Sequence, residues 1–195
     1  MLEILQKSML SKEEIVSLLS LRGNKQQQLF SHAANVKRQQ TGNIVWLRGL
    51  IELSNRCMKD CYYCGIRCSN KEVTRYSLTH DEVMQVVTRA YEKGYGSVAI
   101  QSGEVSSKTF TDKINKMVSD SKRMTQGKIG ITLSCGEQSE ETYRRWFESG
   151  ADRYLLRIET SSEALYGRLH PNDDMHSYVK RVKALESLRK TGYQV

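Results

Sequence analysis

Three thiols fall within eight residues of this chain, in the run Cys57-Met58-Lys59-Asp60-Cys61-Tyr62-Tyr63-Cys64, with the spacing C-x3-C-x2-C. The run directly follows the apolar stretch Leu50-Ile51-Glu52-Leu53, which predicts a strand. The thiols are therefore expected in the loop that leaves this strand. From one loop, three sulfur atoms can converge on a single soft metal centre.

The number of thiols indicates the kind of metal centre. A 4Fe-4S cube held by three thiolates has one iron without a protein ligand, and that iron can take the amino and carboxylate groups of a small molecule. Electron-transfer clusters normally use four thiolates. The alternative is a zinc site with Cys57, Cys61, Cys64 and Cys68 as ligands, although structural zinc sites usually join two separated pairs. Otherwise Cys68 and Cys135 are interpreted as ordinary buried or half-buried thiols.

Apolar runs alternate with helical patterns around the cysteine run. Strands are predicted over residues 49–53, 97–100, 129–133 and 153–158, and helices begin near residues 80, 110, 140, 163 and 177. Two further helices precede the first strand, over residues 12–19 and 25–40. Capping boxes, in which a Ser or Thr and a Glu three residues later bond to each other's backbone N–H, begin at Ser11 and Thr79.

Strands that alternate with helices predict an α/β fold with a parallel sheet and right-handed crossovers. The 195 residues, 38% of them hydrophobic, allow one domain with a core. We therefore expect a partial (β/α) TIM-type barrel, with N-terminal helices in residues 1–43 and the first βα units in residues 44–195. A fifth strand begins at Tyr193, so the chain is expected to be a fragment of a larger barrel, truncated near strand five.

Polar residues follow each of the later strands. The second strand runs into Gln101-Ser102-Gly103-Glu104, the third into Ser134-Cys135-Gly136-Glu137, and the fourth into Arg157-Ile158-Glu159-Thr160. Any one of these segments could be a solvated loop. In (β/α) barrels, however, functional groups lie where the strands end, at one end of the barrel. Together with the cysteine loop, the segments therefore predict a functional site at this end.

The cysteine spacing, with Tyr63 before the third cysteine, resembles that of the radical S-adenosylmethionine (SAM) enzymes. The resemblance implies that Cys57, Cys61 and Cys64 hold a 4Fe-4S cluster, which reductively cleaves SAM to methionine and a 5'-deoxyadenosyl radical. Ser102-Gly103-Glu104 resembles the Gly-Gly-Glu motif of the superfamily, whose backbone faces the methionyl amino group of SAM. Glycine permits this close approach because it has no Cβ.

Longer runs resemble the radical SAM maturases of iron-only ([FeFe]) hydrogenases, in the biotin synthase-like group: residues 51–55, 61–67, 101–104, 132–137 and 150–160. This resemblance implies that Arg181 pairs with the SAM carboxylate through two parallel charge-assisted hydrogen bonds. Ser134 and Arg157 would line the substrate cavity, and no catalytic residue is implied beyond the cluster ligands. The full set of implied SAM-binding residues is Tyr63, Gln101, Ser102, Gly103, Glu104, Glu159 and Arg181.

The resemblance also implies partners. They are a small iron-containing, cysteine-derived substrate, an electron donor such as ferredoxin or flavodoxin, and other hydrogenase maturases. The sequence departs from the family at Ile158, where histidine is usual, and in the loop over residues 171–176, which is longer. Because strands five to eight are absent, the isolated chain is expected to be inactive even if its parent is active.

Other functions remain as alternatives. Biotin synthase and methylornithine synthase share the implied fold and cysteine motif, and a zinc or iron-sulfur module that binds RNA would suit a chain with 30 Lys+Arg against 22 Asp+Glu. The basic residues are scattered, however, which favours a solvated surface. The four histidines are too scattered to predict a second metal centre. No run reaches membrane-spanning length, and residues 1–7 lack a signal-peptide pattern, so a cytoplasmic protein without a membrane partner is expected.

Overall fold

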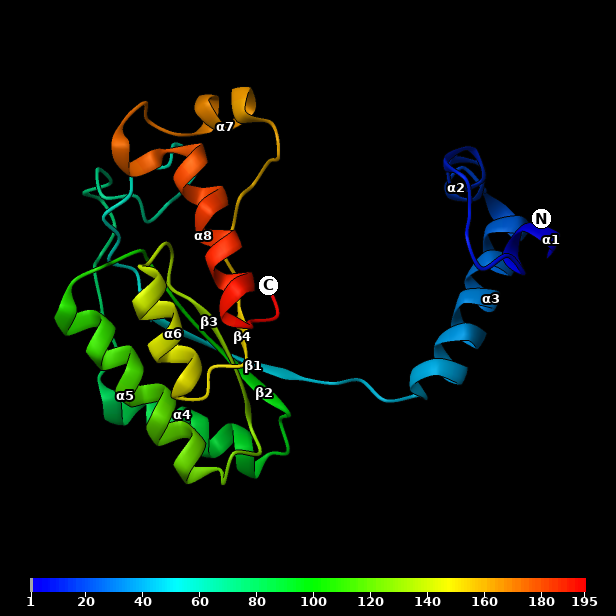
Figure 1. The fold of residues 1–195 in the computed structure, drawn as a ribbon. Coiled ribbons are helices and arrows are strands. Elements are labelled where there is room, and N and C mark those ends of the chain that lie inside the picture. The colour runs from blue at the N-terminus through cyan, green and yellow to red at the C-terminus, as the bar shows by residue number, and fades with distance from the viewer. Residues whose placement is uncertain (1) are drawn as a thin grey trace. The chain divides into compact units, whose positions relative to one another are not determined.

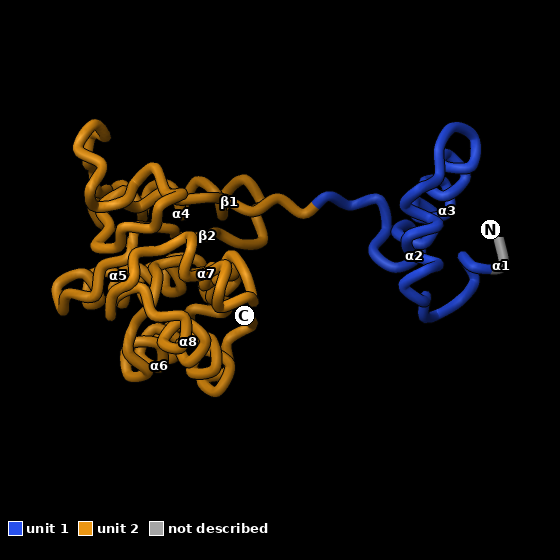
Figure 2. Tube along the Cα trace, turned by 90° about the horizontal axis from the view of Figure 1, so that it is seen from above, with its two compact units in different colours: residues 1–45 blue, residues 46–195 orange. Residues whose placement is uncertain are grey.

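The computed structural model describes residues 2–195, and the chain divides into two compact units. Unit 1 ends at Val45, and unit 2 comprises Trp46–Val195 (Figure 2). Unit 1 consists of helices α1 (Leu2–Leu5), α2 (Lys12–Leu19) and α3 (Gly23–Thr41). The predicted capping box opens α2, since Ser11 Oγ accepts the Glu14 N–H and the Glu14 carboxylate accepts the Ser11 N–H. No side chain of α3 is buried, so unit 1 has little core of its own.

Unit 2 is built on a four-stranded sheet. Its strands are β1 (Arg48–Ser54), β2 (Ser97–Ser102), β3 (Gly130–Ser134) and β4 (Arg153–Tyr154). They lie in the order β1-β2-β3-β4, and every neighbouring pair is parallel. The α/β class and the parallel sheet predicted from the sequence are confirmed. The carboxyl ends of all four strands consequently meet at one edge, which we call the mouth.

Helices connect the strands and cover one face of the sheet. Those between the strands are α4 (His80–Glu92), α5 (Lys108–Met124) and α6 (Glu140–Glu148). After β4 come α7 (Glu163–Leu169), the 3-10 helix η1 (Asp174–His176) and α8 (Tyr178–Thr191). Figure 1 shows α4, α5 and α6 against the sheet and α7 near the loop that follows β1. The apolar stripes of α4 and α5 bury Val83, Val87, Ile114 and Met117 against Ile131, which is fully buried.

The other face of the sheet is less covered. In β1, Ile51 and Leu53 are buried, whereas the alternate residues Leu50 and Glu52 are exposed, as the two-residue period of a strand requires. In a closed barrel this second face would point inward. The exposed side chains of β1 therefore lie on the face that a closed barrel would enclose.

The fourth strand is shorter than predicted. Residues 153–158 were expected to form it, but β4 ends at Tyr154. Leu155 N–H still donates to Leu133 O at 2.8 Å, while on the other side Tyr154 N–H donates to Gln194 O at 3.1 Å. Beyond this point, no strand of the described residues 2–195 continues the ladder, and Glu159 adopts a positive φ of 65°. The prediction failed because an apolar run does not show where pairing stops.

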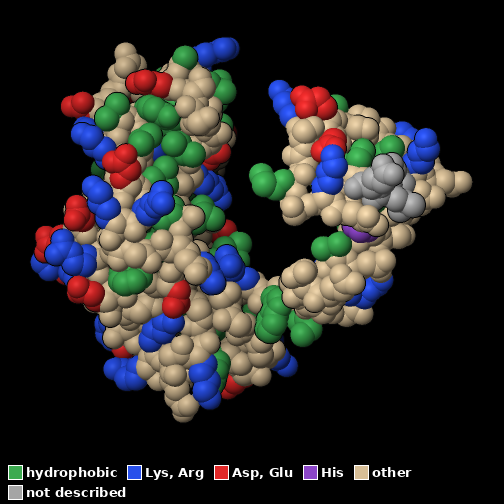
Figure 3. Space-filling model, turned by 45° about the vertical axis from the view of Figure 1, so that its right-hand side comes forward, with side chains coloured by type: hydrophobic (Ala, Val, Ile, Leu, Met, Phe, Trp, Pro, Cys, Tyr) green, Lys and Arg blue, Asp and Glu red, His purple; other side chains and the backbone are tan. Residues whose placement is uncertain are grey.

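The surface carries mixed charge. On the face shown in Figure 3, Lys and Arg side chains alternate with Asp and Glu over unit 2. Several of the lysines and arginines are held in ion pairs with carboxylates, such as Lys108 with Asp112 and Lys122 with Asp152. Within residues 2–195, no helix combines the length and the apolar character that crossing a membrane requires.

Candidate functional site

A cavity of about 130 Å³ opens at the mouth. The loops that follow β1, β2, β3 and β4 contribute to it, and α8 closes one side. Ten residues predicted from the sequence line it together: Cys57, Cys61, Cys64, Gln101, Ser102, Gly103, Glu104, Ser134, Arg157 and Arg181. The lining also contains residues that the sequence analysis did not single out: Lys59, Ile66, Gly136, Leu155 and Leu156.

Gly103 brings the first two loops together. A Cβ at this position would lie 2.8 Å from the Cβ of Cys57 and would collide with the carbonyl group of Arg56. Two backbone hydrogen bonds hold the contact, from Gly103 N–H to Ser54 O at 3.0 Å and from Met58 N–H to Glu104 O at 2.9 Å. Glycine is needed here because only a residue without Cβ allows the cysteine loop to lie on the loop after β2.

The three cysteines of the motif face the cavity and are partly buried. Two backbone N–H groups point at Cys57 Sγ, from Lys59 at 3.4 Å and from Glu104 at 3.3 Å. Burial raises the pKa of the Cys57 and Cys61 thiols, so the free chain holds both as neutral thiols at neutral pH. A cysteine binds a metal as a thiolate, and backbone N–H donors of this kind stabilise the thiolate form.

These residues fit a 4Fe-4S cluster held by three thiolates. Among the described residues, no three His, Cys, Asp or Glu side chains surround a single metal ion, so the sulfur atoms do not converge on one point as predicted. In a cube, each thiolate binds a different iron, and a common point is not required. Cys68 lies outside the cavity and is exposed, which corrects its interpretation as buried or half-buried and gives no support to a four-thiolate zinc site. Cys135 is fully buried, and burial raises its pKa to about 11.

Four charged side chains, from the cysteine loop and from the segments around it, form ion pairs with one another. The Lys59 ammonium lies 3.1 Å from Glu104 Oε1 and 3.2 Å from Glu137 Oε2. The Arg181 guanidinium lies 2.7 Å from Glu137 Oε1 and 3.5 Å from Glu104 Oε2. We call Lys59, Glu104, Glu137 and Arg181 the charge cluster. Two cations and two carboxylates balance, as buried charges must.

The structure places Arg181 at the cavity but already engaged. It is 7% exposed, and although burial opposes its charge, Glu137 and Glu104 raise its pKa. A ligand carboxylate would therefore share or replace these partners, and the assignment of Arg181 to SAM stays a prediction. Burial raises the pKa of Glu104 although Arg181 and Lys59 oppose this. A Cβ on Gly136 would overlap the Glu104 side chain, so this glycine makes room for the carboxylate.

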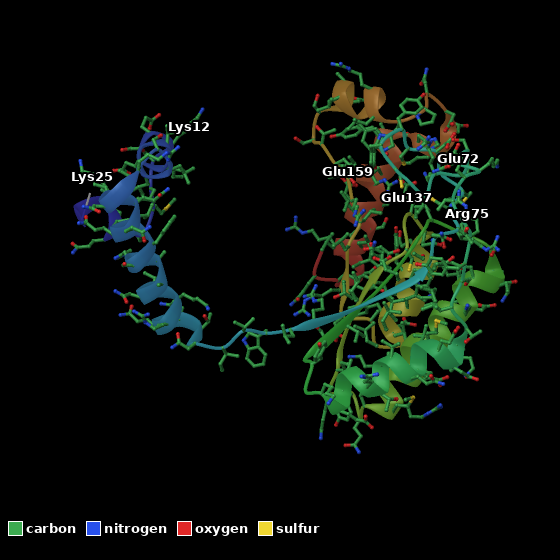
Figure 4. All side chains as sticks on the ribbon, turned by 180° about the vertical axis from the view of Figure 1, so that it is seen from behind. Lys12, Lys25, Glu72, Arg75, Glu137 and Glu159 are labelled. Carbon is green, nitrogen blue, oxygen red and sulfur yellow. The ribbon has the colours of Figure 1, made fainter. Side chains whose placement is uncertain are left out.

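Two predicted SAM-binding residues do not line the cavity. Tyr63 is half-exposed, and its hydroxyl lies 3.3 Å from His170 Nε2. Burial of the ring raises the pKa of Tyr63, with the neighbouring Cys61 and Glu159 adding to the shift. Glu159 is exposed and lies at the same end of unit 2 as Glu137 (Figure 4). The structure therefore leaves both residues beside the cavity.

The segment between α7 and α8 holds the cysteine loop in place. Asp60 N–H donates to His176 Nε2 at 2.8 Å, and the other ring nitrogen, Nδ1, lies 2.7 Å from Asp173 Oδ1. Tyr62 N–H donates to Leu169 O at 3.0 Å. Although the histidines are scattered in the sequence, the fold brings His170 and His176 together behind this loop.

Arg75 organises the residues on either side of the cysteine run. Its guanidinium donates to four backbone carbonyls, those of Asn55, Ile66, Arg67 and Asn70, at 2.5 to 3.0 Å. Figure 4 shows it on the same end of unit 2 as Glu137. The sequence analysis missed Arg75, His176 and Lys59, and it named Glu137 only as part of the polar segment that follows the third strand. Lys59 could have been noticed as the one basic residue inside the cysteine run.

The sheet and the mouth together define a parallel α/β protein of the (β/α) barrel type, with a cavity lined by three cysteines at the carboxyl ends of its strands. Residues 51–195 match the Radical SAM superfamily, and the chain belongs to this superfamily.

Two curated relatives extend along the whole chain. It is 36% identical to the [FeFe] hydrogenase maturase subunit HydE of Thermotoga maritima over 194 residues, which are 99% of this chain and 54% of that protein. It is 27% identical to the 3-methylornithine synthase of Methanosarcina barkeri over 99% of this chain and 54% of that protein. The resemblance to hydrogenase maturases that the motifs indicated is thus confirmed, and the chain spans about half the length of the curated relatives that it matches.

Solved structures show the same fold. The structure of methylornithine synthase (PylB) superposes with a TM-score of 0.80 at 26% identity, over 98% of this chain and 56% of that chain. The structure of HydG, a maturase of the [FeFe]-hydrogenase, gives a TM-score of 0.77 at 26% identity, over 98% of this chain and 44% of that chain. The prediction of a partial TIM-type radical SAM barrel is confirmed by both.

Proposed function

We propose that this chain is the cluster-binding part of a radical SAM enzyme that matures the [FeFe]-hydrogenase H-cluster. Cys57, Cys61 and Cys64 hold a 4Fe-4S cluster, and the enzyme cleaves SAM reductively to a 5'-deoxyadenosyl radical. One observation carries the proposal: the three thiols line a single cavity together with Ser102 and Gly103. The 36% identity to a HydE protein supports the role in maturation over the other roles in the superfamily.

The residues of the mouth have separate tasks in this proposal. The bound cluster supplies a low-potential electron, which is chemistry that no side chain offers. The loop after β2 lies against the cysteine loop at Gly103, so a backbone carbonyl of this loop could accept a hydrogen bond from the amino group of SAM. Arg181 and Glu159 would orient the carboxylate and the rest of SAM, while Ser134 and Arg157 line the cavity toward a small iron-containing, cysteine-derived substrate. Leu155 and Leu156 add apolar side chains to the wall of the same cavity.

A second candidate within the superfamily is a methylornithine synthase or a biotin synthase. The TM-score of 0.80 with methylornithine synthase favours it, and 27% identity to curated proteins of both kinds agrees. The substrate residues that would separate these roles come from strands beyond the fourth. A low-potential electron donor such as ferredoxin or flavodoxin, and other hydrogenase maturases, are the partners that the maturase role would need.

Anaerobic reconstitution with iron and sulfide tests the proposal, followed by EPR of the dithionite-reduced protein with and without SAM. We expect a reduced 4Fe-4S signal that changes when SAM is added and is lost in the Cys57→Ala, Cys61→Ala, Cys64→Ala triple variant. Cys68→Ala is the matched control and should keep the signal, because Cys68 lies outside the cavity. Stoichiometric zinc without a cluster signal would refute the proposal. Stoichiometric 5'-deoxyadenosine from this chain alone would contradict the expectation that it is inactive in isolation.

A further inference from the structure

We propose that Lys59 is a positioning residue, whose buried ammonium fixes the cysteine loop to the mouth by pairing with Glu104 and Glu137. The inference rests on the proposed function in that the loop is assumed to carry the cluster. Lys59 lies between the proposed cluster ligands Cys57 and Cys61 and is not itself a ligand. The inference gives a role to its positive charge, which the proposed function otherwise leaves without one.

Lys59 is buried to a degree that lysine rarely reaches. It is 4% exposed, and its ammonium contacts Glu104 at 3.1 Å, Glu137 at 3.2 Å and the carbonyl oxygen of Met175. Removing an ammonium from water costs several kcal/mol unless it is paired and hydrogen-bonded. Three acceptors from three separate segments satisfy its three protons, so the side chain is held in one place.

The position of Lys59 in the loop gives these contacts their effect. Of the three residues between Cys57 and Cys61, Met58 is 39% exposed and Asp60 contacts η1 through its backbone, while Lys59 turns into unit 2. Its partners follow β2, β3 and α7, respectively. One ammonium therefore joins the cysteine loop to three other segments that form the mouth.

The balance of charge makes Lys59 irreplaceable by an apolar residue of the same length. With Lys59, the charge cluster has two cations for two carboxylates; without it, Arg181 alone would face Glu104 and Glu137. Like charges that share a buried site repel each other or take up a proton. The two carboxylates would then separate, and the loops after β2 and β3 would move away from the cysteine loop.

Three variants separate charge from packing. Lys59→Met keeps the length of the side chain and removes its charge, whereas Lys59→Arg keeps the charge. The double variant Lys59→Met with Glu137→Gln removes one cation and one carboxylate, leaving Arg181 and Glu104 as a balanced pair. Lys108→Met is the matched control, because Lys108 is exposed and makes only a surface pair with Asp112.

Hydrogen exchange of residues 56–64 in the metal-free 195-residue chain is the first readout. Residues 113–124 of α5 are the internal reference, since they exclude Lys108 and its partner Asp112. Lys59→Met should raise the exchange rate of the cysteine segment about tenfold, a coupling within the usual range for contacting residues, and leave α5 unchanged. Lys59→Arg and the double variant should stay closer to the wild type than Lys59→Met does. After reconstitution, Lys59→Met should bind less iron per chain and show a smaller fraction of cluster that responds to SAM.

Two results would overturn the inference. One is a Lys59→Met chain whose cysteine segment exchanges like that of Lys108→Met. The other is a Lys59→Arg chain or a double variant as perturbed as Lys59→Met, since charge would then not be the cause. If Lys59→Met does not fold, the double variant still decides, because restored balance should restore folding. The exchange measurement needs no cluster, so a wild-type chain that assembles none would refute the proposed function and leave the result for Lys59 standing.

Discussion

Gly103→Ala tests whether the contact between the cysteine loop and the loop after β2 holds the site together. The added Cβ would lie 2.8 Å from the Cβ of Cys57 and closer still to the carbonyl group of Arg56. Backbone atoms surround this position, so no flexible side chain can turn away. The two loops must move apart to accept a single methyl group.

The size of the effect follows from these distances. Carbon atoms prefer a separation of at least about 3.5 Å, so the 2.8 Å contact with Cys57 alone requires a displacement of roughly 0.7 Å, and the closer contact with the Arg56 carbonyl group requires more. A shift of this kind lengthens the hydrogen bonds from Gly103 to Ser54 and from Met58 to Glu104. Overpacking of a tight contact costs about 1–3 kcal/mol in the free energy of unfolding. With a urea m-value of about 2 kcal/mol/M, the midpoint should fall by roughly 1 M.

Urea denaturation followed by circular dichroism measures this change, and iron content after reconstitution reports the site. Gly65→Ala is the matched control, because Gly65 lies in the same loop and a Cβ there meets no atom within 4 Å. Its free energy of unfolding should stay within about 0.5 kcal/mol of that of the wild type. Gly103→Ala should also bind less iron. If its midpoint and iron content equal those of Gly65→Ala, the close approach at Gly103 does not hold the loops, and the reasoning fails.

Three further predictions concern the same mouth. Arg75→Lys should lower the free energy of unfolding by about 2 kcal/mol in urea denaturation, because a single ammonium cannot reach all four carbonyls that the guanidinium serves; an unchanged midpoint would contradict this. Burial lowers the pKa of His170, so below its ordinary value of 6.5 the unfolded chain takes up a proton that the folded chain does not. The free energy of unfolding should therefore fall as pH drops below 6.5, and it should fall less in His170→Phe. An equal dependence of this free energy on pH in the two proteins would refute the prediction. Cluster assembly should quicken as pH rises from about 7 to about 9, because burial raises the pKa of Cys57 and Cys61 and ligation requires thiolates; initial rates of iron uptake that do not depend on pH would speak against it.

The order of elements was predictable from local sequence. Capping residues and apolar stripes in the sequence predict helices, and both predicted capping boxes, at Ser11 and at Thr79, are confirmed. The parallel sheet follows from the alternation of strands and helices, because a chain with such connections has few other ways to cover both faces of its strands. The end of β4 was not predictable, since it depends on a neighbouring strand rather than on residues 155–158 themselves.

The sequence by itself predicted the site: three cysteines with this spacing and the polar residues after the later strands account for nine residues that line the cavity, and the resemblance to hydrogenase maturases added Arg181. Only the tertiary structure showed what holds that cavity in shape. Lys59 lies 78 residues before Glu137, and Glu137 lies 44 residues before Arg181, so no local sequence pattern indicates that they are partners. The attraction between buried charges depends on their distance in the folded chain, where water no longer screens them. These charges come close together only when the sheet has formed and the carboxyl ends of its strands lie at one mouth.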